Sequence, residues 1–106
     1  MIKFKQYNNG FAIEGHSHRE ACGIVTFMSY SCAKLIKKLD PSVVYYTSSY
    51  DNNDLGVTYF NFNPQIETAR LIFNDSIDSL MGWCNKHYPG EISFIKLDTY
   101  LTINVE

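Results

Sequence analysis

The chain has 106 residues, which is long enough for one hydrophobic core and too short for two domains. Hydrophobic residues make up 45% and aromatic residues 15% of the sequence, as in folded globular proteins and unlike disordered ones. The formal net charge of -2 does not favour binding to nucleic acid or to an anionic membrane.

No apolar run approaches the roughly 18–20 residues that span a bilayer, and the amino terminus lacks the apolar core of a signal peptide. The three cysteines Cys22, Cys32 and Cys84 are an odd number and do not follow the spacing of a disulfide framework. We therefore expect a cytoplasmic protein with reduced thiols, without a membrane segment.

A hairpin followed by a helix is predicted in the first half of the chain. Residues 1–7 and 11–15 flank Asn8-Asn9-Gly10, and Asn-Gly between apolar stretches is a strong hairpin signal. From about residue 24 to residue 39 the apolar residues follow helical spacing, and Asp40-Pro41 is expected to end this helix. The apolar positions are Val25, Met28, Cys32, Leu35, Ile36 and Leu39, whereas Lys34, Lys37 and Lys38 are expected on the solvent-exposed side.

The second half follows the same order of elements. Residues 42–50 and 57–63 are rich in Val, Tyr, Phe and Thr and flank a polar loop, which predicts a second hairpin. Asn63-Pro64 predicts a helix opening with Asn63 as N-cap, and Pro89-Gly90 predicts its end near Tyr88. This helix is expected to bury Ile66, Ala69, Phe73, Ile77, Leu80, Met81 and Cys84.

Residues 91–105 are expected to form a final strand or a strand pair. The predicted order is therefore ββαββαβ, an α+β fold of two layers in which two helices cover the apolar face of a mostly antiparallel sheet. The whole chain, residues 1–106, is expected to be a single domain.

The chemistry-bearing residues are concentrated between the first hairpin and the first helix. His16 follows Gly15 at the end of a predicted strand, and Cys22 stands six positions later, just before the helix. The start of a helix favours a thiolate, and a nearby imidazole can take the thiol proton. The pattern predicts a thiol active site made of His16 and Cys22.

This stretch resembles the ribosomal-processing cysteine protease family, Prp. The signature of that family is Gly-His, a short Gly-rich polar loop and then Asp-Ile-Val-Cys at the start of a helix. Gly15-His16 matches the first part and Ile24-Val25 matches the second. Residues 66–89, which contain Ala69-Arg70-Leu71-Ile72 and end in His87-Tyr88-Pro89, are similar to the family's second helix, so the resemblance covers nearly the whole chain.

The resemblance implies that His16 is the catalytic histidine and that the position of the nucleophile falls on Thr26. The aspartate position falls on Gly23, and the loop is about two residues shorter than in the family. The family removes the amino-terminal extension of a large-subunit ribosomal protein, and its members tend to form dimers. By this resemblance we expect a divergent, homodimeric member that binds a protein or peptide segment without efficient cleavage.

Two other functions remain open. One is an active cysteine protease that uses Cys22 with His16, and the other is a structural or dimeric interaction protein in which the site has no role.

A hydroxyl is far less acidic than a thiol, so Thr26 is expected to cap or pack in the first helical turn instead of acting as a nucleophile.

Zinc binding is a further alternative for the same loop, because His16, His18, Glu20 and Cys22 all carry possible ligand atoms. Their spacing matches no standard structural zinc site, and no second ligand pair follows downstream. We therefore expect no metal and no cofactor, and we expect Cys32 and Cys84 to be core residues.

Overall fold

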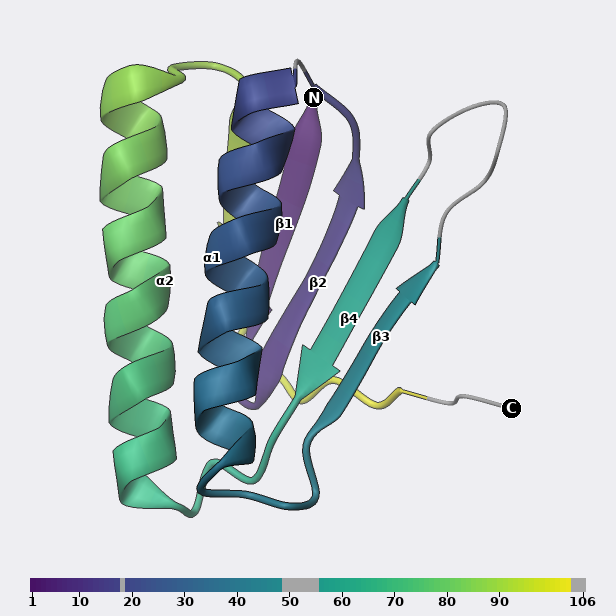
Figure 1. Cartoon of the computed structure of the whole chain (residues 1–106), viewed down its shortest axis with the longest axis vertical. Helices are drawn as coiled ribbons and strands as arrows, with labels where there is room; N and C mark the ends of the chain where they lie inside the picture. The colour runs from purple at the N-terminus through teal and green to yellow at the C-terminus, as the bar shows by residue number, and fades with distance from the viewer. Residues whose placement is uncertain (18, 49–55, 104–106) are drawn as a thin grey trace.

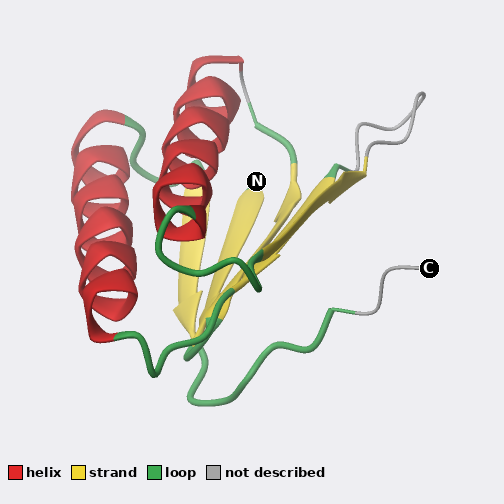
Figure 2. Ribbon diagram, turned by 60° about the horizontal axis from the view of Figure 1, so that its bottom comes forward, coloured by secondary structure: helices red, strands yellow, loops and turns green. Residues whose placement is uncertain are grey.

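The computed structural model describes residues 1–17, 19–48 and 56–103. Its elements, in chain order, are β1 (Ile2–Tyr7), β2 (Gly10–Gly15), α1 (Arg19–Lys37), β3 (Val44–Ser48), β4 (Val57–Asn61), α2 (Glu67–His87) and β5 (Ile92–Lys96). The five strands form one sheet in the order β3-β4-β2-β1-β5, in which β5 runs parallel to β1 and the other neighbours are antiparallel. Both helices lie on one face of this sheet (Figures 1 and 2), which confirms the predicted α+β fold.

The first hairpin has a two-residue turn at Asn8 and Asn9, since Tyr7 pairs with Gly10 across it. Gly10 also allows β4 to pass close to β2, because a Cβ atom at this position would lie 1.8 Å from the carbonyl oxygen of Phe60. No side chain fits in that space, so glycine is required here for the pairing of β2 with β4.

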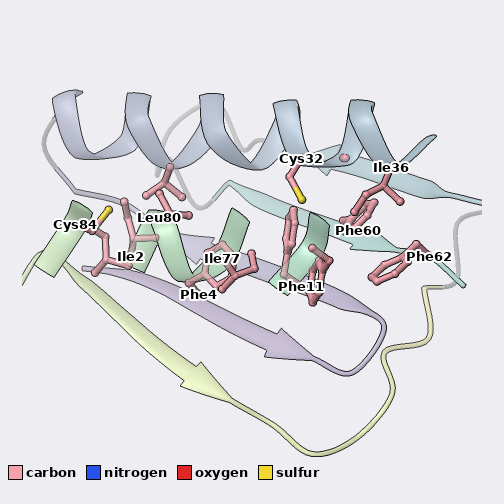
Figure 3. Packing of buried hydrophobic residues seen from close by; sticks show 14 of the residues in the cluster. Ile2, Phe4, Phe11, Cys32, Ile36, Phe60, Phe62, Ile77, Leu80 and Cys84 are labelled. Carbon is pink, nitrogen blue, oxygen red and sulfur yellow. The ribbon is translucent and has the colours of Figure 1, made fainter. Parts of the chain in front are cut away.

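Aromatic residues from the sheet fill the space beneath the helices (Figure 3). The rings of Phe4 and Phe11 lie 5.2 Å apart between centroids, and those of Phe11 and Phe60 lie 5.0 Å apart. Burial of each such side chain contributes about 1.5–3 kcal/mol, so this row of rings is a major source of stability. Of the residues expected to be buried in α2, Ala69, Phe73, Ile77, Leu80 and Cys84 are buried, whereas Ile66 and Met81 are only partly so.

The buried face of α1 is narrower than predicted. Val25, Cys32 and Ile36 are buried as expected, but Leu35 is 46% exposed and Leu39 is 41% exposed. The sequence interpretation of these two leucines was wrong. The face of α1 toward the sheet follows the spacing of Val25, Cys32 and Ile36, and Leu35 projects to one side of it. Leu39 lies beyond the end of α1.

The first helix begins at Arg19, about five residues earlier than the apolar pattern predicted. Arg19, Glu20 and Ala21 favour helix, the acidic Glu20 is favourable in the first turn, and Ala21 is fully buried. Cys22 therefore lies in the first turn of α1 and not in the loop before it.

The second helix begins at Glu67, three residues later than the sequence predicted, with Ile66 as its N-cap. The Oδ1 atom of Asn63 accepts a hydrogen bond from the backbone N–H of Gln65 at 3.0 Å. The Asn63 side chain thus stabilises a turn over residues 63–65, which is a second common role of asparagine. Asn63 is therefore not the N-cap of α2.

The last segment forms a single strand and not a pair. In the described part of the segment after β5, residues 97–103 have no strand structure, and the Asn9 side chain holds Leu101 by hydrogen bonds of 3.0 and 2.7 Å. In the second hairpin β3 begins two residues later and β4 ends two residues earlier than predicted, and residues 49–55 between them lie outside the described residues. Among the described residues, neither helix has the length of apolar sequence that crossing a bilayer requires.

Asp40 joins the end of α1 to the segment that precedes α2. Its side chain is 2% exposed and accepts hydrogen bonds from the Ser42 hydroxyl at 2.6 Å, the Ser42 backbone N–H at 2.9 Å and the Asn63 backbone N–H at 2.7 Å. Burial alone would raise the pKa of Asp40, but these hydrogen bonds to the charged form outweigh burial and hold the pKa below its ordinary value.

Replacing Asp40 with asparagine is expected to destabilise the protein by about 1–3 kcal/mol, because an amide nitrogen cannot accept the bonds that one carboxylate oxygen now accepts. Since the pKa of Asp40 is lowered by folding, this stabilisation is complete above the unfolded-state value of about 3.9 and is lost as the pH falls through the folded-state value. Urea unfolding at pH 7 and pH 3 should therefore show a larger difference between wild type and Asp40→Asn at pH 7. Asp78→Asn, on the exposed face of α2, is the control, and an equal difference at both pH values would contradict the role of Asp40.

Candidate functional site

His16 stands at the end of β2, where the backbone makes an abrupt change of direction. Gly15 has a φ of 95°, and a Cβ atom there would lie 2.4 Å from the carbonyl oxygen of Met1. Glycine is therefore needed both for this left-handed conformation and for the close approach of β1. The carbonyl of His16 accepts a hydrogen bond from the Met1 nitrogen at 2.8 Å, which fixes the backbone while the imidazole stays exposed.

Cys22 faces His16 from the first turn of α1. Its Sγ atom lies 3.7 Å from Nδ1 of His16, and the Cys22 side chain is half-buried. The sulfur also accepts a hydrogen bond from the Ser17 backbone N–H and can donate to the Ser17 carbonyl oxygen, both at 3.3 Å. The two residues that the sequence singled out as a thiol–imidazole pair are thus neighbours in space.

Ser17 and Glu91 hold the loop that carries His16. The Ser17 hydroxyl donates a hydrogen bond to the Glu91 carboxylate, and the Glu91 carbonyl oxygen accepts one from the backbone N–H of Ile2 at 3.1 Å. The connection between α2 and β5 therefore supports the Cys22 site through Glu91, which follows Ser17 by 74 residues along the chain. Sequence reasoning missed both residues, because only the folded chain brings Glu91 to Ser17.

A groove with a volume of about 270 Å³ runs from this pair along α1, on the side of β4 and β3. It contains His16, Cys22 and Thr26 in its lining, together with Ile2, Ile13, Gly15, Val25, Tyr45, Thr47, Gly56 and Thr58. Thr26 is exposed and follows Cys22 by one helical turn, so the two side chains lie on the same side of α1. The expectation that Thr26 caps or packs in the first helical turn was wrong, because α1 begins earlier and Thr26 is exposed in its second turn.

The remaining candidate residues do not join this site. Cys32 is 4% exposed and Cys84 is 1% exposed, and burial raises the pKa of both thiols, which confirms them as core cysteines. His18, one of the possible zinc ligands, lies outside the described residues. Among the residues that the structure does describe, no group of three or more His, Cys, Asp or Glu side chains is arranged to hold a metal ion.

We predict that iodoacetamide alkylates Cys22 about tenfold or more faster than Cys32 and Cys84 in the native protein, because the other two thiols are buried and resist ionisation. His16→Gln should slow alkylation of Cys22 several-fold, since glutamine cannot accept the thiol proton. Peptide mass spectrometry at pH 7 measures each rate.

The matched control for this prediction is His87→Gln, which removes an exposed histidine that packs against Trp83 at the end of α2. This control should leave the Cys22 rate unchanged. Equal rates in wild type and His16→Gln would show that the imidazole does not act on the thiol.

Comparison with protein-family models and with curated proteins gives no match. Solved structures do match: the ribosomal processing protease Prp from S. aureus, in complex with a covalently linked product peptide, has a TM-score of 0.70 at 18% sequence identity, covering 92% of this chain and 100% of that one. The same protease with a substrate peptide gives a TM-score of 0.69 at 15% identity and the same coverage. SMU.848 from Streptococcus mutans gives a TM-score of 0.69 at 12% identity, covering 92% of this chain and 93% of its own. The chain therefore has the fold of the ribosomal processing protease Prp.

Proposed function

We propose that this protein binds an extended peptide segment in the groove beside α1, and that Cys22 attacks a carbonyl carbon of that segment with His16 as its general base. The observation that carries the proposal is the 3.7 Å separation of Cys22 Sγ from His16 Nδ1 at the end of an open groove. The S. aureus protease of the same fold is known with a covalently linked product peptide, which supports the same class of chemistry by analogy of fold.

The proposed reaction is acyl transfer followed by hydrolysis. His16 Nδ1 takes the Sγ proton as the sulfur forms a bond to the carbonyl carbon. The C–N bond then breaks, the amine leaves with the proton that His16 accepted, and the acyl group stays on Cys22 as a thioester. Water hydrolyses the thioester to a carboxylic acid and regenerates the thiol. The Sγ–Nδ1 distance suits this role, because such contacts tighten when substrate binds.

Thr26 has a binding role in this proposal. Its Cβ lies about 5–6 Å from that of Cys22, as expected for residues four apart on a helix. At that spacing its hydroxyl serves as a hydrogen-bond donor or acceptor for the peptide backbone next to the reacting carbonyl. Cys22, and not the residue at the family's nucleophile position, is then the attacking group.

Binding without cleavage is the second candidate function, and one contact favours it. The Ser17 carbonyl oxygen lies 3.3 Å from Sγ, closer than His16 Nδ1, so it competes with the imidazole for the thiol proton.

In both candidates the family resemblance points to the amino-terminal extension of a large-subunit ribosomal protein as the bound segment. It also points to a homodimer, and the three cysteines without the spacing of a disulfide framework favour the cytoplasm as the location.

Incubation with two sets of peptides tests the proposal: a library of peptides from a digested bacterial proteome, and synthetic peptides spanning amino-terminal extensions of large-subunit ribosomal proteins. Mass spectrometry should find new peptide ends and an acyl adduct on Cys22. Cys22→Ala should abolish both while retaining peptide binding, and His16→Gln should slow cleavage by about 100-fold or more. His87→Gln serves as the control and should cleave at the wild-type rate.

The outcomes separate the two candidates. Retention of peptides by the wild-type protein with neither cleavage nor adduct would establish the binding function and exclude the peptidase. Absence of any retained or cleaved peptide would exclude both and leave the structural interaction protein.

A further inference from the structure

The groove continues beyond the Cys22 site along α1. A second hollow, of about 360 Å³, is lined by Tyr30, Ala33, Lys34, Lys37, Val43 and Tyr45. Tyr45 also lines the first hollow, so the two hollows adjoin at this residue, which packs against Tyr30 of α1. Figure 1 shows the reason: β4 and β3 extend beyond α1 on the side away from α2, where no helix covers them.

The length of this groove suits one extended peptide. From Cys22 the helix rises about 18 Å to Lys34 and about 22 Å to Lys37, at about 1.5 Å per residue. An extended chain advances about 3.3 Å per residue, so roughly five to seven peptide residues span the same distance. A single segment with its reacting carbonyl at Cys22 therefore reaches both lysines.

The far end of the groove is positively charged, although the chain as a whole carries a net charge of -2. Lys34 and Lys37 are both exposed and both line the second hollow. Among the described residues that line either hollow, none is an aspartate or a glutamate. The two ammonium groups are thus free of a carboxylate from the groove itself, and they attract anionic side chains of a bound segment.

Beside these lysines the groove wall is aromatic. Tyr30 is 51% exposed, and its ring packs edge-on against that of Tyr45, with centroids 5.8 Å apart and planes at 68°. A tyrosine pair of this kind offers apolar contact area with a polar rim, and such residues are enriched where proteins bind partners.

We propose, on the basis of the proposed function above, that the bound segment is acidic at one end. It carries carboxylates about five to seven residues from the reacting carbonyl, where they pair with Lys34 and Lys37, and an apolar or aromatic side chain between these points packs against Tyr30 and Tyr45. Lys34 and Lys37 are therefore specificity-determining residues and not only the solvated side of a helix.

Fluorescein-labelled mixture libraries of 12-residue peptides test this proposal with the Cys22→Ala protein, which cannot form a thioester. Two adjacent positions near either end are fixed as Glu, Gln or Lys, so that both directions of binding are sampled. Fluorescence anisotropy at low salt should give about three- to tenfold tighter binding for the best Glu library than for its Gln counterpart, and weaker binding for the Lys library. The preference should shrink in 1 M NaCl, where charges are screened.

The variant Lys34→Gln/Lys37→Gln, made in the Cys22→Ala background, should remove the preference for Glu, so that the Glu and Gln libraries bind with equal affinity. Lys3→Gln/Lys86→Gln, which changes the net charge equally at exposed sites outside the groove lining, should keep the preference. Thermal melting checks that both variants remain folded.

Two failures are distinguishable. Binding of all libraries without a preference for Glu, or an equal loss of preference in both double variants, would overturn the acidic specificity and leave the proposed function standing. Absence of binding by every library would overturn the proposed function, and the acidic specificity with it.

Discussion

Two helices lie on one face of the five-stranded sheet and leave one of its edges uncovered, and this arrangement positions the groove beside α1. α1 and α2 pack over the aromatic row of β1, β2 and β4, which forms the core (Figure 3). On the face of the sheet that carries the helices, β3 and the adjoining part of β4 lie beside α1 and are not covered by a helix. The groove is formed by this surface and the flank of α1, and its two hollows together extend from His16 to Lys37. Core packing and groove formation thus follow from the same arrangement of layers.

The geometry of the Cys22 and His16 pair at the end of the groove depends on contacts made by the neighbouring backbone. Gly15 lets β1 approach closely enough for the Met1 nitrogen to bond to the His16 carbonyl. The Ser17 backbone contacts the sulfur of Cys22 directly, and the Ser17 side chain is tied to Glu91. A thiol and an imidazole six residues apart in a free loop would sample many separations, whereas these contacts hold them near one geometry.

The sequence predicted the order of elements because the signals for it are local: Asn8-Asn9-Gly10 marks the first hairpin, and the spacing of Ala69, Phe73 and Ile77 marks the second helix. Prediction from the sequence failed where a local signal is weak or is compatible with two local structures. Residues 19–21 carry no run of large apolar side chains, so the first turn of α1 was not recognised. Asn63 favours a helix cap and a turn alike, and only the packed structure separates them. The link from Ser17 to Glu91 has no local signal, because it exists only after α2 and β5 have packed.

The early start of α1 places Cys22 near the amino-terminal end of this helix. The amide-rich end of a helix favours a thiolate only within about one turn, so what matters is the distance of a side chain from the helix start and not its place in an aligned motif. With α1 beginning at Arg19, Cys22 lies in that turn and Thr26 lies beyond it.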